Sequence, residues 1–138
     1  GHGGLMTLLD LYTGARIWGK EIGGIQTPWV TKQFIFVITT DHQMLCLTRD
    51  DGILVWAKKL PMYEDPEDAS DPIVWNGPLL VHDRLLITGS DGSILSISPY
   101  TGEFLGKIDL DDPINISPII ADGFVYILTD GAELIAFK

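Results

Sequence analysis

The amino-acid sequence predicts an all-β fold, a partial β-propeller of about three four-stranded antiparallel blades. Three observations lead to this class. A strand–turn–strand stretch recurs along the chain, and its copies fall in a frame close to 40 residues long. No window keeps the apolar spacing of an amphipathic helix without a Gly or Pro interruption. Repeats of about 40 residues with four short strands each are typical of propeller blades.

The recurring stretch occupies residues 9–18 and returns at 47–56 and 97–106. In each copy an apolar strand ends, a short polar loop bends at a glycine, and a second strand starts. The bend needs a residue that tolerates positive φ, which glycine does without a steric penalty. In the first copy, Asp10 can close the loop by hydrogen-bonding the backbone two residues on. The turn glycines of the three copies are Gly14, Gly52 and Gly102.

A tryptophan follows the turn glycine by four residues in the first two copies, as Trp18 and Trp56. An indole supplies a large apolar face that suits the packing of one sheet on another. The third copy has Gly106 at this position. We therefore expect the blade interface at Gly106 to pack less well than the others.

Three prolines mark corresponding points of successive units. Pro78 and Pro118 lie 40 residues apart, whereas Pro28 and Pro78 lie 50 residues apart because the second unit carries an insertion. Proline is tolerated near the start of a strand, where its missing N–H costs no ladder hydrogen bond. The prolines therefore indicate where the units begin.

Taken in order, the apolar runs predict an outer half blade, a complete blade, an inserted loop, a second complete blade and a partial blade of three strands. The first complete blade opens with a short strand over Ile25–Val30. It continues with the apolar run Phe34–Ile38, which suits a strand buried on both faces. The predicted ranges are 5–22 for the half blade, 26–60 for the first blade, 61–72 for the loop, 73–110 for the second blade and 114–138 for the partial blade.

We interpret the segment from Pro61 to Pro72 as an acidic, solvated surface loop. Its like charges repel one another, and its prolines prevent a helix. A calcium loop and a docking site for a basic partner are the alternatives. Known calcium loops use a glycine for the bend, and no glycine lies in this segment. The acidic residues are Glu64, Asp65, Glu67, Asp68 and Asp71.

Composition narrows the classes of function. The 138 residues are 46% hydrophobic and 20% charged, which suits a packed core and argues against disorder. Nineteen acidic residues against nine basic ones give a net charge of −10. This charge disfavours nucleic acids and anionic membrane surfaces as partners. No apolar run is long enough to span a bilayer as a helix.

The chain begins with four residues, Gly1-His2-Gly3-Gly4, that include no methionine and no apolar leader. We interpret residues 1–4 as a tag scar and linker, and residues 5–138 as an incomplete propeller. We therefore expect the chain to be a fragment of a longer protein.

The pattern apolar-Asp-x-x-Thr-Gly-x-x-x-Trp, intact at Leu9–Trp18, resembles the repeat of pyrroloquinoline quinone (PQQ)-type eight-bladed propellers. Two further stretches, Trp75–Pro78 and Leu128–Phe137, are similar to a non-enzymatic branch of that family. Members of this branch are lipoproteins of the outer-membrane β-barrel assembly machinery. The resemblance covers nearly the whole chain and implies the C-terminal blades of an eight-bladed parent.

The resemblance implies a non-enzymatic scaffold without a cofactor, which binds proteins of the barrel-assembly complex in the periplasm at the outer membrane. The alternative is a PQQ-dependent quinoprotein dehydrogenase, in which the quinone stacks on a tryptophan and, in the alcohol enzymes, on a vicinal cysteine pair. The chain has one cysteine, which argues against such an enzyme. A third reading, an adhesion-type propeller with another ligand, draws no support from the residues. We interpret four tryptophans as packing residues: Trp18, Trp29, Trp56 and Trp75.

Other catalytic patterns are absent from the sequence, which has no Gly-x-Ser-x-Gly elbow, His-Glu-x-x-His pair or phosphate loop. His42 and His82 fall between strands and are interpreted as turn residues. Cys46 lies within a strand pattern and is interpreted as a buried small apolar residue rather than a reactive thiol. The sequence predicts no catalytic, cofactor-binding or metal-binding residue. It singles out only structural repeat positions: Asp10, Gly14, Trp18, Pro28, Gly52, Trp56, Pro78, Gly102 and Pro118.

In the family branch named above, a strand from the start of the full-length chain completes the last blade. The chain would then expose a free sheet edge at each end, and exposed edges recruit other strands. We therefore expect the chain to self-associate edge to edge.

Overall fold

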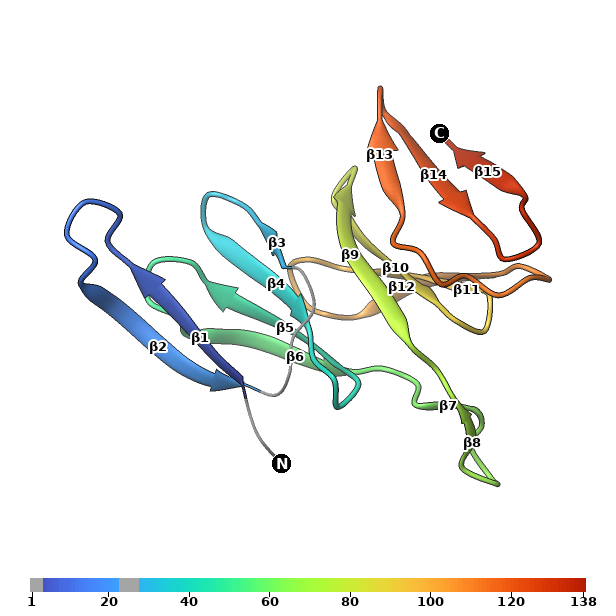
Figure 1. Ribbon diagram of the computed structural model, residues 1–138, viewed down its shortest axis with the longest axis horizontal. Helices are drawn as coiled ribbons and strands as arrows, with labels where there is room; N and C mark the ends of the chain where they lie inside the picture. Colours follow the sequence, from blue (N-terminus) through green and yellow to red (C-terminus); the bar gives the residue numbers. More distant parts are fainter. Residues whose placement is uncertain (1–3, 23–27) are drawn as a thin grey trace.

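The computed structural model describes residues 4–22 and 28–138, which form antiparallel sheets placed side by side like a fan (Figure 1). No helix occurs within these residues. The predicted all-β class with antiparallel blades is therefore confirmed. Residues 1–3 of the predicted scar and residues 25–27 of the predicted strand over 25–30 lie outside the described residues.

Four sheets, numbered here in chain order, make up the fan, and consecutive strands are neighbours within each. Sheet 1 pairs β1 (Gly4–Leu9) with β2 (Arg16–Ile22). Sheet 2 contains β3 (Trp29–Val30), β4 (Phe34–Ile38), β5 (Gln43–Thr48) and β6 (Leu54–Lys59). Sheet 3 contains β9 (Trp75–Val81), β10 (Arg84–Gly89), β11 (Ser93–Ile97) and β12 (Phe104–Asp109). Sheet 4 contains β13 (Ile119–Ala121), β14 (Phe124–Leu128) and β15 (Leu134–Phe137).

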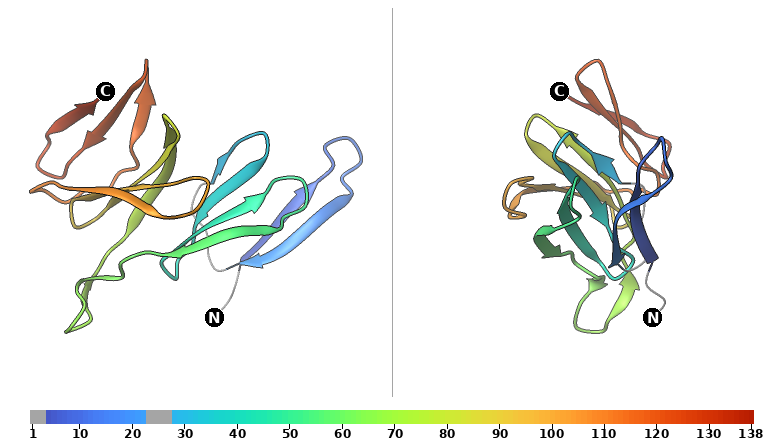
Figure 2. Two further views of the ribbon diagram at one scale, coloured as in Figure 1. Left: turned by 180° about the vertical axis from the view of Figure 1, so that it is seen from behind. Right: turned by 90° about the vertical axis from the view of Figure 1, so that its left-hand side faces the viewer.

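Residues 61–72 differ from the expected loop, because β7 (Tyr63–Asp65) and β8 (Ser70–Pro72) pair as an antiparallel hairpin. The hairpin projects away from the four sheets (Figure 2). Its turn is closed by the Asp65 carboxylate, which accepts hydrogen bonds from the backbone N–H groups of Glu67 and Asp68 at 3.1 and 3.3 Å. This local bonding gives the acidic segment an ordered turn.

Three apolar layers fill the spaces between successive sheets. The two faces of β4 supply two different layers, because side chains alternate along a strand. Phe36 and Ile38 pack between sheets 2 and 3, whereas Ile35 and Val37 pack between sheets 1 and 2. The prediction that this strand is buried on both faces is confirmed. The third layer lies between sheets 3 and 4 and includes Ile94, Ile114, Val125 and Ile127.

The two repeat tryptophans connect sheet 1 to a turn of sheet 2, and sheet 2 to a turn of sheet 3. Trp18 of β2 donates its indole N–H to the Arg49 carbonyl oxygen at 2.9 Å. Trp56 of β6 donates in the same way to the Pro99 carbonyl oxygen at 2.9 Å. Both acceptors lie in the loop that contains the next repeat's glycine. Each indole therefore spans from one copy of the repeat to the following copy.

The indole rings also lie against the turn glycines. A Cβ added to Gly52 would lie 2.6 Å from Trp18 Cδ2, and one added to Gly102 would lie 2.6 Å from Trp56 Cε3. Gly14 occupies the same turn in the first copy, with φ of 72°, yet no atom of the described residues lies within 4 Å of an added Cβ. The glycines thus allow positive φ and, in two copies, leave room for an indole.

We predict that Gly102→Ala destabilises the chain more than Gly14→Ala. The φ angles of 79° and 72° are similar, so either alanine introduces about 1–2 kcal/mol of backbone strain. Only the alanine at residue 102 also collides with Trp56, and overpacking of this kind costs about 1–3 kcal/mol more. Denaturant unfolding followed by tryptophan fluorescence measures both losses. Equal losses for the two variants would contradict the proposed role of the indole contact.

Candidate functional site

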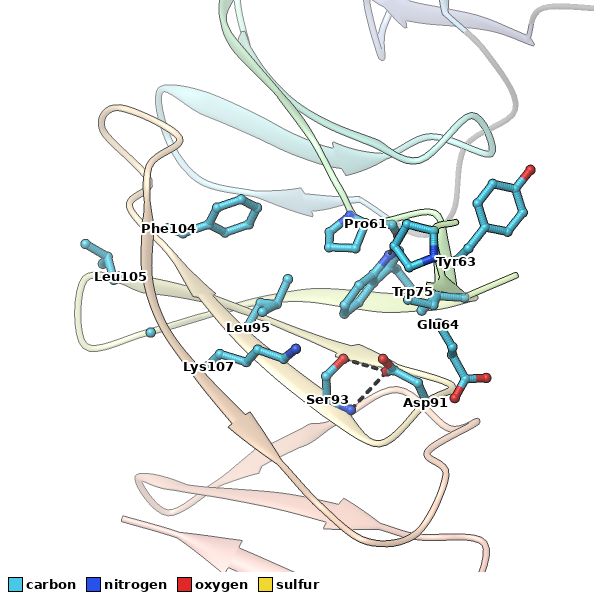
Figure 3. Close-up of a pocket in the computed structure, with 13 residues that line it drawn as sticks. Pro61, Tyr63, Glu64, Trp75, Asp91, Ser93, Leu95, Phe104, Leu105 and Lys107 are labelled. Atoms are coloured by element: carbon cyan, nitrogen blue, oxygen red, sulfur yellow. Dashed lines mark hydrogen bonds between the residues drawn. The ribbon is translucent and has the colours of Figure 1, made fainter. Parts of the chain in front are cut away.

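A hollow of about 640 Å³ opens between the β7–β8 hairpin and sheet 3 (Figure 3). Its floor is made by Ile73, Trp75 and Leu95, which are 3–5% exposed. Pro61 and Phe104 supply apolar walls from the start of the hairpin and from β12. We call this hollow the hairpin pocket. Its interior is therefore apolar.

Hydrogen bonds at the base of the hairpin hold the walls of the pocket together. Trp75, the first residue of β9, donates its indole N–H to the Pro61 carbonyl oxygen at 2.8 Å. The backbone N–H of Ile73 donates to the Met62 carbonyl oxygen at 2.9 Å. Because these bonds join the two chain segments on either side of the hairpin, the hairpin is tied to sheet 3. The pocket is thus formed by the fold itself.

One end of the pocket carries charged side chains (Figure 3). The Asp91 carboxylate, in the turn between β10 and β11, accepts hydrogen bonds from the Ser93 N–H at 3.0 Å and the Ser93 hydroxyl at 2.5 Å. Glu64 lines this end from the hairpin, and Lys107 lines it from β12. Lys107 Nζ also lies 3.5 Å from an Asp109 carboxylate oxygen. The charged end is therefore acidic on balance.

β12 forms the second side of the site and lies at the edge of sheet 3. All six of its residues are exposed, whereas the corresponding strand β6 buries Trp56. Gly106 stands at the equivalent position of β12, and among residues 4–22 and 28–138 no atom lies within 4 Å of a Cβ added there. An edge strand presents unpaired backbone N–H and C=O groups. The site thus combines an apolar pocket with a free strand edge.

None of the repeat positions that the sequence singled out lines the hairpin pocket. Two signals in the sequence pointed to it, the acidic insertion and the glycine in place of tryptophan. Neither signal shows that the start of the insertion lines a pocket together with Trp75. That contact depends on the hydrogen bond from Trp75 to Pro61, which links residues that no sequence pattern pairs.

The remaining repeat positions lie at turns and at the starts of strands. The Asp10 carboxylate accepts hydrogen bonds from the N–H groups of Thr13 and Tyr12, both at 2.9 Å, and these bonds hold the pKa of Asp10 below its ordinary value. Pro28 and Pro118 directly precede β3 and β13. Pro78 differs, since it lies within β9.

The histidines and the cysteine have structural surroundings. His42 and His82 lie in turns, as predicted, and the His42 ring Nε2 donates to the Ile73 carbonyl oxygen at 2.8 Å. Cys46 is 1% exposed in the layer between sheets 2 and 3, which confirms its interpretation as a buried residue. Burial raises the pKa of the Cys46 thiol to about 11.

Residues 4–22 and 28–138 contain neither a metal-binding cluster nor a membrane-spanning helix. No group of three or more His, Cys, Asp or Glu side chains in these ranges is placed to hold a metal ion. The same ranges contain no helix that could cross a membrane.

Comparison with known proteins identifies relatives of this chain. A family model described as outer membrane protein assembly factor BamB matches residues 1–58. The BamB proteins of Salmonella typhimurium and Escherichia coli are 27% and 26% identical to the chain over 123 residues, or 88% of its length. The chain resembles BamB. The predicted resemblance to the PQQ-like repeat family is thereby confirmed. The chain spans 29% of the length of these BamB relatives.

Solved structures show the same fold. The crystal structure of BamB from Moraxella catarrhalis superimposes with a TM-score of 0.70 at 23% identity, covering 98% of this chain and 41% of that one. The computationally designed Ika4 protein gives 0.74 at 12% identity, covering 98% of this chain and 79% of its own. The WD40 domain of SCAP from fission yeast gives 0.59 at 16% identity, covering 95% and 36%. At these identities the likeness concerns architecture alone.

We predict that the folded chain loses stability between pH 9 and pH 11 because of Cys46. Its pKa is about 11 in the folded chain against 9.0 for an unperturbed thiol, so the unfolded chain releases its proton first as pH rises. A two-unit difference of this kind lowers the free energy of unfolding by about 2 kcal/mol. Denaturant unfolding at pH 8 and pH 11 measures the loss.

Cys46→Ala is the control, since it removes the thiol and leaves every other titrating group in place. The variant should lose less stability than the parent over the same pH interval. An identical pH dependence in both chains would show that Cys46 does not contribute.

Proposed function

We propose that this chain is part of a non-enzymatic scaffold that binds other proteins during outer membrane protein assembly, in the periplasm at the outer membrane. The observation that carries the proposal is the similarity to BamB over 88% of the chain. BamB relatives are described as outer membrane protein assembly factors. The exposed strand edges add physical support, because edges of this kind bind extended segments of other proteins.

The surroundings of the tryptophans support a scaffold over a PQQ-dependent dehydrogenase. Trp18, Trp56 and Trp75 each donate the indole N–H to a backbone carbonyl. The rings of Trp18 and Trp56 also lie against glycine turns, and Trp29 packs against the layers on either side of sheet 3. A stacked quinone would need an open indole face. Trp18, Trp56 and Trp29 instead use their indole faces to join sheets.

The charge of the chain favours partners with basic surfaces. The net charge is −10, and charge complementarity speeds the encounter of proteins that bind one another. Protein partners therefore fit the chain better than nucleic acids, which carry the same sign of charge.

A binding experiment tests the assembly role. The immobilised 138-residue chain should retain β-barrel assembly proteins from a detergent extract of bacterial outer membranes, as measured by mass spectrometry. The designed Ika4 protein is a suitable control, since it shares the fold at 12% identity. Equal retention of these proteins by both columns would contradict the proposal. Quinone-dependent dye reduction by the purified chain would instead favour a dehydrogenase.

We also predict that the chain self-associates through its end sheets. Sheet 1 leaves Leu5, Leu9 and Ile17 more than half exposed, and Leu134 of the edge strand β15 is 64% exposed. Sedimentation velocity up to about 100 µM should show a concentration-dependent increase in mass. Leu134→Lys should weaken the association, since edge lysines oppose strand pairing. Met62→Lys adds the same charge on the hairpin and should leave the association unchanged.

A single monomeric species at every concentration would contradict this prediction. An equal effect of the two lysine variants would show that overall charge, and not the edge of β15, controls the association.

A further inference from the structure

We propose that the hairpin pocket and the free edge of β12 together bind an extended, basic peptide segment that inserts one aromatic side chain into the pocket. This inference goes beyond the assembly role, because it concerns the chemistry of one site and holds for whichever protein supplies the segment. Size, backbone geometry and charge support it independently.

The size and lining of the pocket suit an aromatic side chain. Its volume of about 640 Å³ falls within the roughly 300–1,000 Å³ typical of pockets that enclose small ligands. The floor residues Ile73, Trp75 and Leu95 are apolar and buried. The one polar atom of the Trp75 ring already donates to Pro61, so the floor offers no free donor to a polar ligand. This floor therefore favours the burial of an apolar ring.

The position of β12 suits an extended backbone next to the pocket. A strand added to the sheet would lie about 4.8 Å beyond β12, with alternate side chains on each face. Lys107 is opposite Leu95 in the strand register, so the two share one face of the sheet. Both residues line the pocket. Side chains that an added strand projects on this face would therefore point toward the hollow.

Gly106 keeps the other face of β12 open. It is opposite Ser96 in the register, and no atom in the part of the chain that the structure describes lies within 4 Å of an added Cβ. In the two preceding copies of the repeat this position is an indole that contacts the next sheet. The third copy therefore leaves its edge strand β12 uncovered beside the apolar pocket. An added strand can thus reach both β12 and the hairpin pocket.

The acidic residues around the pocket indicate that the bound segment is basic. The hairpin carries five acidic residues and no basic one between residues 61 and 72, and Glu64 and Asp91 both line the pocket. Lys107, the one basic residue of the lining, is near Asp109. Lysine or arginine side chains on either side of the inserted ring would meet these acids. A second copy of this chain, with its net charge of −10, is a poorer occupant.

Calorimetric titration with three synthetic peptides tests the proposal. The first is a nine-residue peptide of alternating threonine and lysine around a central tryptophan, with both ends blocked. In the second, alanine replaces the tryptophan, and in the third, glutamate replaces the lysines. We expect the first peptide to bind the 138-residue chain, and each of the others to bind about tenfold more weakly or less. Equal affinity for the three peptides, or binding of none of them, would overturn the proposal.

Two matched substitutions locate the site on the hairpin. Glu64 lines the pocket, whereas Glu67 does not, and both are exposed residues of the same hairpin. E64K and E67K change the net charge equally, so any long-range effect is shared. E64K should weaken binding of the first peptide about tenfold, and E67K should weaken it no more than about twofold. Equal weakening would mean that the peptide senses only overall charge, and the proposed site would be wrong.

A second pair of variants tests the apolar wall of the pocket, and it replaces the first pair if E64K fails to fold. Phe104 and Ile108 belong to β12 and are 44% and 47% exposed, but only Phe104 lines the pocket. F104A should weaken binding of the first peptide at least about fivefold, and I108A should leave this affinity nearly unchanged. The thermal midpoints of both variants, measured by circular dichroism, show that the chain is folded. Equal effects of the two variants would overturn the proposal.

Amide hydrogen exchange identifies the strand edge. Binding of the first peptide should slow exchange in β12 and leave β2, β6 and β15, which also lie at sheet edges, unchanged. Slower exchange at β2, β6 or β15 in place of β12 would overturn the assignment of the edge. If E64K alters self-association of the chain while leaving peptide affinity unchanged, the occupant is a second copy and the proposal is wrong.

Discussion

The contact between a repeat tryptophan and the glycine turn of the next repeat organises this structure. Each indole satisfies its N–H on a backbone carbonyl of the next repeat and lies against a glycine that has no Cβ to obstruct it. The contact joins units that are separate sheets with no strand pairing between them. Sheet stacking therefore depends on side-chain packing, with Phe36, Ile38, Ile35 and Val37 filling the layers on both faces of one strand.

The same contact explains why the third copy of the repeat differs from the others. With Gly106 in place of an indole, β12 covers no neighbouring turn and stays exposed along its length. The residues inserted before sheet 3 fold into a hairpin that lines a pocket together with this strand, and Trp75 ties the base of the hairpin to the sheet. A position that lost its packing role thus borders a pocket.

This arrangement fits a protein that works by binding. Acidic side chains are concentrated on the hairpin and around one end of the pocket, while the interior of the pocket is apolar. Such a combination recognises extended, basic segments with large side chains better than compact polar ligands. The chain is similar to BamB, which is described as an outer membrane protein assembly factor, and the proposed peptide site at β12 agrees with a role in binding proteins.

The class of fold follows from the sequence alone, because the repeat period, the turn glycines and the alternation of apolar residues are local properties. The sequence also determined that Phe34–Ile38 is buried on both faces and that Cys46 is inside, since unbroken apolar runs require such positions. The three-dimensional contacts were needed to show that residues 61–72 form a hairpin and that hairpin residues line a pocket together with Trp75 and Leu95. The hairpin pocket comes from contacts between segments far apart in the chain, and such contacts leave no periodic signal in the sequence.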